Sequence, residues 1–129
     1  MFIKLYAVSI TAFLALDFLW LGFIAKGLYA RQIGQLLKPD VNWVAAILFY
    51  LIFVAGLVVF VIQPSLRESW TNAALMGAFF GLVAYATFDL TSLALLRDWP
   101  VLVTVIDLAW GATLGAAVSV ITHVVVSRW

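Results

Sequence analysis

Four long apolar stretches dominate this sequence, and each is long enough to cross a lipid bilayer as a helix. We place them at Phe2 to Ala25, Asn42 to Gln63, Asn72 to Leu96 and Val101 to Val126. A hydrocarbon core of about 30 Å requires about 20 apolar residues in a helix. The 129 residues are 67% hydrophobic and only 10% charged, whereas a soluble domain is about 45–50% apolar. The sequence therefore predicts an integral membrane protein.

The links between the stretches indicate how the helices pack. Short links join the second stretch to the third and the third to the fourth, so these neighbours should be antiparallel. We expect an all-α, integral membrane four-helix bundle that forms a single domain over residues 1–129. Asp17 and Asp89 have comparable depths in the first helix of each hairpin, which favours a duplicated helical hairpin.

The first link, Lys26 to Lys38, is longer than the others and has two interpretations. Its apolar residues recur at helical spacing, which predicts a short helix in the plane of the lipid headgroups. An ordinary polar loop is the alternative, because Gly34 weakens a helix. The break after this link is expected at Pro39-Asp40.

Residues at the ends of the stretches fit a membrane interface but do not fix an orientation. Tryptophans prefer the interface, and four of them stand at the expected ends: Trp43, Trp70, Trp99 and Trp129. Lysines and arginines are divided almost evenly between the two sides, so the positive-inside rule does not choose one. With a net charge of +1 and no basic cluster, the chain is not expected to bind nucleic acid. The absence of cysteine excludes disulfides and thiolate chemistry.

Three aspartates inside the apolar stretches are the most informative residues. An ionised side chain at the centre of a membrane costs at least about 2.5–3.5 kcal/mol. Counted at about 1.5 Å per residue from the nearest helix end, Asp17, Asp89 and Asp107 fall in one layer. This layer should lie roughly 10 Å below the surface that carries the first and third links. Tyr50 of the second stretch falls near the same depth, so every helix can contribute a polar group.

Aromatic and hydroxyl side chains near this layer are candidate partners of the acids. Trp20 and Trp110 each follow an aspartate by three residues, which puts acid and indole on one helical face. Hydroxyls on the third and fourth stretches are further candidates: Thr87, Thr91, Ser92 and Thr113.

The sequence places no basic residue at this depth. Clustered carboxylates without a cation can take up protons as a coupled group. Oxygen donors alone would also suit a hard cation such as Na⁺, Mg²⁺, Ca²⁺ or Mn²⁺.

The candidate site therefore combines three acids with aromatic and hydroxyl residues, and it needs no cofactor beyond a proton or a hard cation. Its residues are Asp17, Asp89, Asp107, Trp20, Trp110, Tyr50 and Thr91. If a hard cation binds, the three aspartates are its expected ligands. The alternative is a structural role, because a protonated aspartate can join neighbouring helices by a hydrogen bond.

Small residues and the single histidine favour packing over chemistry. Gly77 and Gly81, like Gly111 and Gly115, stand four residues apart, which predicts closely packed helices. We expect a similar role for Gly22. His123 is expected at the opposite surface as an interfacial residue, because no acid of its own stretch is near it.

Four motifs carry a resemblance to a known family. They are Asp17-Phe18-Leu19-Trp20-Leu21-Gly22, Thr87-Phe88-Asp89-Leu90-Thr91, Arg97-Asp98-Trp99-Pro100 and Asp107-Leu108-Ala109-Trp110-Gly111. In this order they resemble the bacterial family called domain of unknown function 2177, over essentially the whole chain. The resemblance implies a small multi-pass protein of the bacterial cytoplasmic (inner) membrane and implies no activity. Ser92 stands where the family favours asparagine.

Three functions fit the acid layer, and they make different demands on the structure. A proton- or cation-binding site for transport or permeation requires access of water to the acids, and a homodimer would help to enclose a pathway. An enzyme acting on a lipid or isoprenoid requires a lateral opening to the membrane, with Asp89 and Asp107 as general acid and base. A subunit that binds membrane lipids or a partner helix requires exposed ridges of small residues. The sequence leaves the substrate open.

Overall fold

The computed structural model of the protein describes residues 1–37 and 41–128. Four of its helices are long and apolar enough to cross a membrane: Phe2–Ile24, Trp43–Ser65, Trp70–Leu95 and Val101–Ser127. Their ends lie within two residues of those expected from the sequence, and the described residues contain no strand. The all-α membrane class is thus confirmed. The expected Pro39-Asp40 break and the Trp129 anchor lie outside the described residues.

The first two membrane helices are divided into shorter elements by π-helical segments, whereas the third and fourth are continuous α-helices. In chain order the elements are α1 (Phe2–Leu19), the π-helix η1 (Trp20–Ile24), α2 (Lys26–Ile33), the 3-10 turn η2 (Gly34–Leu36), α3 (Trp43–Leu57), the π-helix η3 (Val58–Ile62), α4 (Gln63–Ser65), α5 (Trp70–Leu95) and α6 (Val101–Ser127). The helix expected in the first link is therefore present as α2.

Side chains at the helix starts explain where α3 and α5 begin. The side chain of Asn42 accepts a hydrogen bond of 3.2 Å from the backbone N–H of Ala45, and Ser69 accepts one of 3.4 Å from Asn72. Such caps satisfy backbone donors that have no partner inside the helix. Pro64 accounts for η3 by a different effect. It has no N–H, so the carbonyl of Phe60 loses its α-helical partner.

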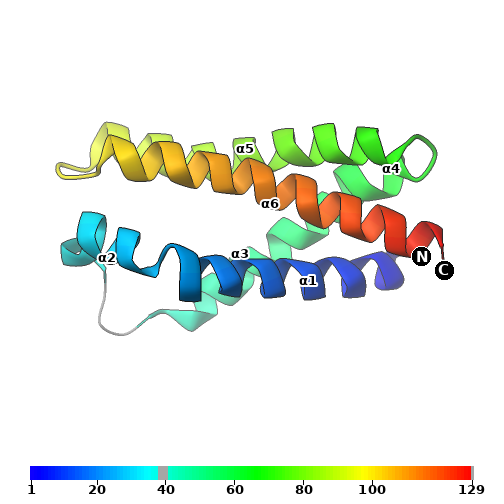
Figure 1. The fold of residues 1–129 in the computed structure, drawn as a ribbon, viewed down its shortest axis with the longest axis horizontal. Helices are drawn as coiled ribbons and strands as arrows, with labels where there is room; N and C mark the ends of the chain where they lie inside the picture. Colours follow the sequence, from blue (N-terminus) through cyan, green and yellow to red (C-terminus); the bar gives the residue numbers. More distant parts are fainter. Residues whose placement is uncertain (38–40, 129) are drawn as a thin grey trace.

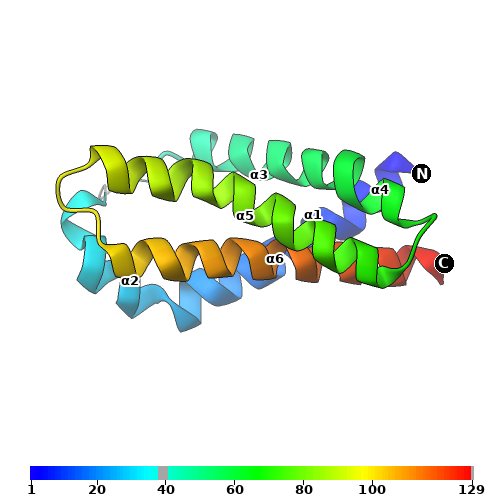
Figure 2. The ribbon, with the colours of Figure 1, turned by 90° about the horizontal axis from the view of Figure 1, so that it is seen from above.

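Glycines bring α5 and α6 into close antiparallel contact, as the sequence predicts. A Cβ added to Gly81 would overlap the carbonyl of Gly111, and one added to Gly77 would overlap that of Gly115. Figures 1 and 2 show α5 and α6 running alongside each other, with α1 against α6 and both chain termini at one end of the bundle. The expectation for Gly22 is wrong, because a Cβ there would meet nothing within 4 Å.

Most of the hydrophobic core lies in one half of the bundle, the half near the chain termini, and Ala25, Ile33 and Val103 are buried at the other end. Its buried residues come from the start of α1, the end of the second membrane helix and the end of α6, and include Leu5, Phe13, Phe53, Leu57, Ile62, Leu114 and Val118. The first half of α3 contains no buried residue before Phe53. The bundle is therefore packed tightly at one end and open at the end that carries the acids.

Candidate functional site

Asp17 is held by a tryptophan of another helix. Asp17 lies on α1 and is 6% exposed. The indole N–H of Trp110, on α6, donates a hydrogen bond of 3.2 Å to its Oδ1. This bond links α1 to α6 at the level of the acids and stabilises the carboxyl group inside the apolar span.

Asp107 is held by a tyrosine from the first link. The hydroxyl of Tyr29, on α2, donates a hydrogen bond of 2.7 Å to Oδ1 of Asp107. The same hydroxyl accepts a hydrogen bond of 3.2 Å from the indole N–H of Trp20. Three elements, η1, α2 and α6, are thus joined in one chain of hydrogen bonds.

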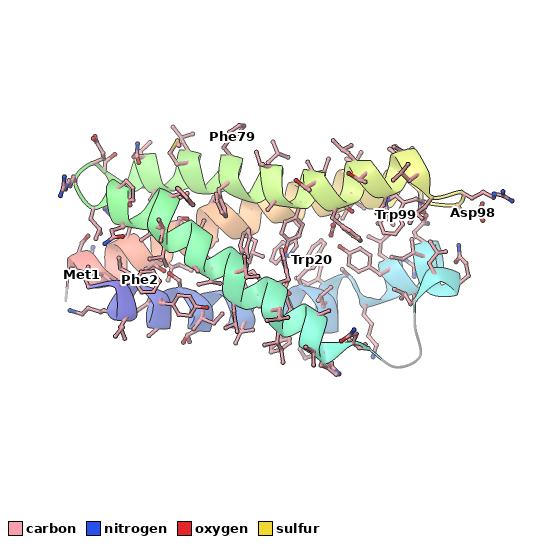
Figure 3. All side chains as sticks on the ribbon, turned by 180° about the vertical axis from the view of Figure 1, so that it is seen from behind. Met1, Phe2, Trp20, Phe79, Asp98 and Trp99 are labelled. Carbon is pink, nitrogen blue, oxygen red and sulfur yellow. The ribbon has the colours of Figure 1, made fainter. Side chains whose placement is uncertain are left out.

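The two tryptophans stack on each other between these hydrogen bonds. Their ring centroids are 4.6 Å apart and the rings are inclined by 8°. In the sequence each indole lies three residues after an aspartate. In the folded chain each indole is linked to the other aspartate instead. Trp110 bonds to Asp17, and Trp20 reaches Asp107 only through Tyr29. Figure 3 shows Trp20 among the helices, whereas Phe79 and Asp98 point outward.

Asp89 is the third acid, and its environment differs from that of the other two. Its side chain is completely buried, and neither carboxyl oxygen has a hydrogen-bond donor among the described residues. Its carboxyl group lies close enough to that of Asp107 for the two to interact. Two facing carboxyl groups can form a hydrogen bond only when one of them carries a proton. Asp89 and Asp107 therefore form a pair that can hold a proton between them.

A cavity of about 630 Å³ adjoins this pair. Asp17 and Asp107 line it together with aromatic residues from every membrane helix and from α2: Trp20, Tyr29, Phe49, Tyr50, Tyr85, Phe88 and Trp110. Asp89 does not line the cavity and interacts with Asp107, which does. The volume is within the range of about 300–1,000 Å³ found for small-molecule sites.

The lining of the cavity includes exposed apolar residues of the membrane helices. Leu21, Phe49 and Phe88 line the cavity and are also 40%, 42% and 59% exposed. They belong to three different membrane helices, and Leu37 of the first link, which is 52% exposed, also lines the cavity. The first half of α3, which includes Phe49, is mostly exposed.

Acidic and phenolic groups surround the pair. They are Asp17 on α1, Tyr29 on α2, Tyr50 on α3 and Tyr85 on α5, which line the same cavity as Asp107. Burial raises the pKa of Tyr29, and the nearby Asp107 and Asp89 raise it further, so its phenol remains a neutral donor. Among the described residues, the charged groups acting on Asp17 and Asp89 belong to Asp107, and no lysine or arginine is one of them.

Most of the residues proposed from the sequence meet at this cavity. It is lined by Asp17, Asp107, Trp20, Trp110 and Tyr50, and Asp89 joins it through Asp107. Thr91 does not line the cavity: it is exposed, because two positions beyond Asp89 a helical side chain points to nearly the opposite face.

The other hydroxyls do not reach the acids. Thr87 and Thr113 each bond to a carbonyl of their own helix, four residues earlier. Sequence reasoning missed Tyr29 and Tyr85. Tyr29 belongs to the apolar pattern of the first link, but only the folded position of α2 directs its hydroxyl to Asp107.

The three aspartates do not form a metal-binding group in this arrangement. Among residues 1–37 and 41–128, no group of three or more His, Cys, Asp or Glu side chains could hold a metal ion. The acids instead form a pair, Asp89 with Asp107, and a separate Asp17 that is bonded to Trp110.

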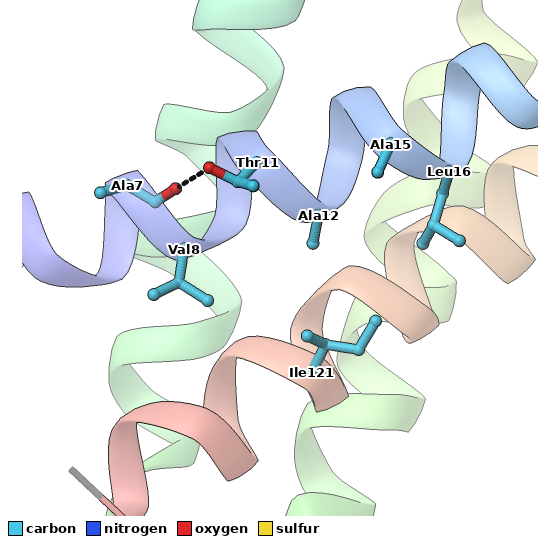
Figure 4. A pocket seen from close by; sticks show the side chains of 7 residues that line it. All are labelled: Ala7, Val8, Thr11, Ala12, Ala15, Leu16 and Ile121. Carbon is cyan, nitrogen blue, oxygen red and sulfur yellow. Dashed lines mark hydrogen bonds between the residues drawn. The ribbon is translucent and has the colours of Figure 1, made fainter.

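Two further features lie at the other end of the bundle. His123 is 9% exposed, and its Nδ1 lies 3.0 Å from Oγ of Ser65, so it packs against the second membrane helix. A hollow of about 570 Å³ lies on the outer face of α1 and is bordered by Ile121 (Figure 4). Its wall on α1 is made mostly of small residues, and the hydroxyl of Thr11 is bonded to the carbonyl of Ala7.

The fold and the buried acids define a small multi-spanning membrane protein with a polar, aromatic cavity. The chain belongs to the family described as predicted membrane protein, domain of unknown function 2177, whose model matches residues 2–124. Comparisons with curated proteins and with solved structures found no match.

Proposed function

We propose that the protein is a membrane transport protein whose Asp89–Asp107 pair takes up and releases protons through the aromatic cavity. A location in the bacterial inner membrane is part of this proposal. One observation carries it: Asp89 is completely buried and has no hydrogen-bond donor among the described residues, yet it adjoins an acid that lines the cavity. Ionisable residues inside membrane spans commonly mark proton or ion pathways.

The arrangement gives each acid a different task. Asp107 touches both the cavity and Asp89, so it exchanges a proton between them. Asp89 holds the proton away from the cavity. Asp17 supplies a second carboxyl to the cavity wall, fixed by Trp110.

A proton suits this geometry better than a hard cation does. Metal ions such as Mg²⁺ and Ca²⁺ require six or more oxygen ligands. The acids are divided between a pair and a separate residue, and they form no group of three in the described part of the chain. A shared proton needs only the two facing carboxyl groups.

Reconstituted liposomes test the proposal. Internal pH is followed with an enclosed dye after proton, Na⁺ or K⁺ gradients are imposed on the wild type and on the Asp89→Asn and Asp107→Asn variants. We expect proton flux in the wild type and a loss of at least tenfold in both variants. Asp98→Asn is the matched control, because Asp98 is exposed in the third link and lies outside the acid layer.

Two results would count against the proposal. The first is wild-type flux no greater than that of protein-free liposomes in every gradient. The second is flux that both variants retain at the level of Asp98→Asn. Circular dichroism and size-exclusion chromatography of each variant show whether a lost flux reflects a lost fold.

The exposed apolar lining of the cavity favours a second candidate, an enzyme that acts on a membrane lipid or isoprenoid. A lipid could enter between Leu21, Phe49 and Phe88, and two adjacent carboxyl groups can serve as acid and base. Comparison of membrane lipids from cells with wild type or Asp107→Asn tests this candidate. A lipid that accumulates only with the variant would favour an enzyme over a transporter.

A further inference from the structure

The cavity has the chemistry of a site for an organic cation. We infer that it binds a lipophilic organic cation, of the quaternary ammonium or phosphonium class, between its aromatic walls and the carboxyl groups of Asp17 and Asp107. This inference rests on the proposed transport function and names the class of substrate.

The walls provide aromatic surface on all sides. The stacked rings of Trp20 and Trp110 form one wall, and Tyr50 and Tyr85 contribute others. The face of an aromatic ring attracts a cation, most strongly for tryptophan and most of all where water is excluded. A quaternary cation has no N–H groups to satisfy, so ring faces and a diffuse negative charge are sufficient to hold it.

The charge of the cavity selects against neutral and anionic ligands. Its two charged residues are both acidic, Asp17 and Asp107. Three of the donors near them are already used: Trp110 bonds to Asp17, Tyr29 to Asp107 and Trp20 to Tyr29. A ligand that must accept hydrogen bonds, such as a carboxylate, would find these donors occupied.

The exposed apolar lining explains why the cation should be lipophilic. Leu21, Phe49 and Phe88 line the cavity and are exposed on membrane helices, so a ligand with apolar substituents can enter from the bilayer. A bound cation next to the Asp89–Asp107 pair also disfavours the proton that the pair holds, because both are positively charged. Cation binding should therefore release a proton, which is the coupling that an exchanger requires.

Equilibrium binding of radiolabelled tetraphenylphosphonium to the protein in lipid nanodiscs tests the inference. Tetraphenylborate has the same shape and the opposite charge, so it is the matched ligand control. We expect saturable binding of tetraphenylphosphonium above empty nanodiscs and no competition by tetraphenylborate. Affinity should fall as the pH is lowered, because protons and the cation compete for the same carboxyl groups.

Variants of the cavity residues provide a second test of the cation site. Asp107→Asn and Trp110→Leu should each weaken tetraphenylphosphonium binding at least tenfold, whereas Trp110→Phe should retain most of it. Trp70→Leu is the control, because Trp70 is 58% exposed and does not line the cavity. If Asp107→Asn fails to fold, Asp17→Asn gives the same readout. Equal binding of tetraphenylborate, no saturable binding, or full affinity in the folded acid variant would overturn the inference.

Proton release separates this inference from the proposed function. It is measured with a pH dye as tetraphenylphosphonium is added to the detergent-solubilised protein in weak buffer. Saturable binding without proton release would support the cation site and count against proton coupling. Proton flux in liposomes without tetraphenylphosphonium binding would support the proton site and count against an organic cation.

Discussion

The hydroxyl of Tyr29 donates a hydrogen bond of 2.7 Å to Asp107, a residue 78 positions later in the chain. Tyr29 belongs to α2, outside the membrane helices, whereas Asp107 lies within α6. The first link is therefore part of the site: it supplies a wall of the cavity and a donor to one acid.

Replacement of this tyrosine tests the contact by its effect on stability. Because burial raises the pKa of Tyr29 above 10.0, its stabilising contribution is complete below pH 10 and is lost as the pH rises further. Tyr29→Phe should lower the free energy of unfolding by about 1 kcal/mol at neutral pH. Thermal unfolding in detergent, repeated at increasing pH, should show a smaller additional loss above pH 10 in the variant than in the wild type. Equal losses of stability above pH 10 in the variant and the wild type would contradict the contact of Tyr29 with Asp107.

The glycine contact between α5 and α6 predicts a strong effect of one methyl group. In Gly81→Ala the new Cβ meets the Gly111 carbonyl, and overpacking of this kind costs about 1–3 kcal/mol. Gly22→Ala is the matched control, because a Cβ there meets nothing within 4 Å, and alanine favours a helix by up to about 1 kcal/mol. Thermal unfolding of both variants measures the difference in stability. A Gly81→Ala protein as stable as Gly22→Ala would show that the two helices are not in contact there.

The three acids should differ in what they contribute to stability. Asp17→Leu leaves the indole N–H of Trp110 without its acceptor, which costs about 1–3 kcal/mol. Asp89→Asn removes a buried carboxyl that has no donor among the described residues and introduces an amide that can donate to Asp107. We expect Asp89→Asn to be at least as stable as the wild type in chemical denaturation. A larger loss in Asp89→Asn than in Asp17→Leu would favour a structural role for Asp89.

Single cysteines can report whether water reaches the cavity, because the natural chain contains none. Ala84 lines the cavity, whereas Phe79 on the same helix is 62% exposed and points outward (Figure 3). In liposomes, Ala84→Cys should react with a membrane-impermeant thiol reagent, and Phe79→Cys, which faces lipid, should not. Failure of Ala84→Cys to react from either side of the membrane would mean that the cavity is dry.

The sequence predicts the fold better than it predicts the site. Hydrophobic length alone locates the four membrane helices, and glycine spacing locates the contact of α5 with α6, because both follow from repeats along one helix. The partners of the acids depend on how helices are rotated against each other. For this reason Trp110 bonds to Asp17 rather than to its own neighbour Asp107, and Thr91 faces outward. The role of Tyr29 depends on the path of the first link, which no periodicity encodes. The duplicated hairpin and the homodimer stay predictions.

Infrared difference spectroscopy directly measures the protonation of the Asp89–Asp107 pair. Protein labelled with carbon-13 in the aspartate carboxyl groups would be stepped from neutral to alkaline pH, in the wild type and in Asp89→Asn. We predict a protonated carboxyl band in the wild type at neutral pH that disappears at alkaline pH and is absent from the variant. Only ionised carboxylate bands at neutral pH, or a protonated band unchanged in Asp89→Asn, would contradict this prediction.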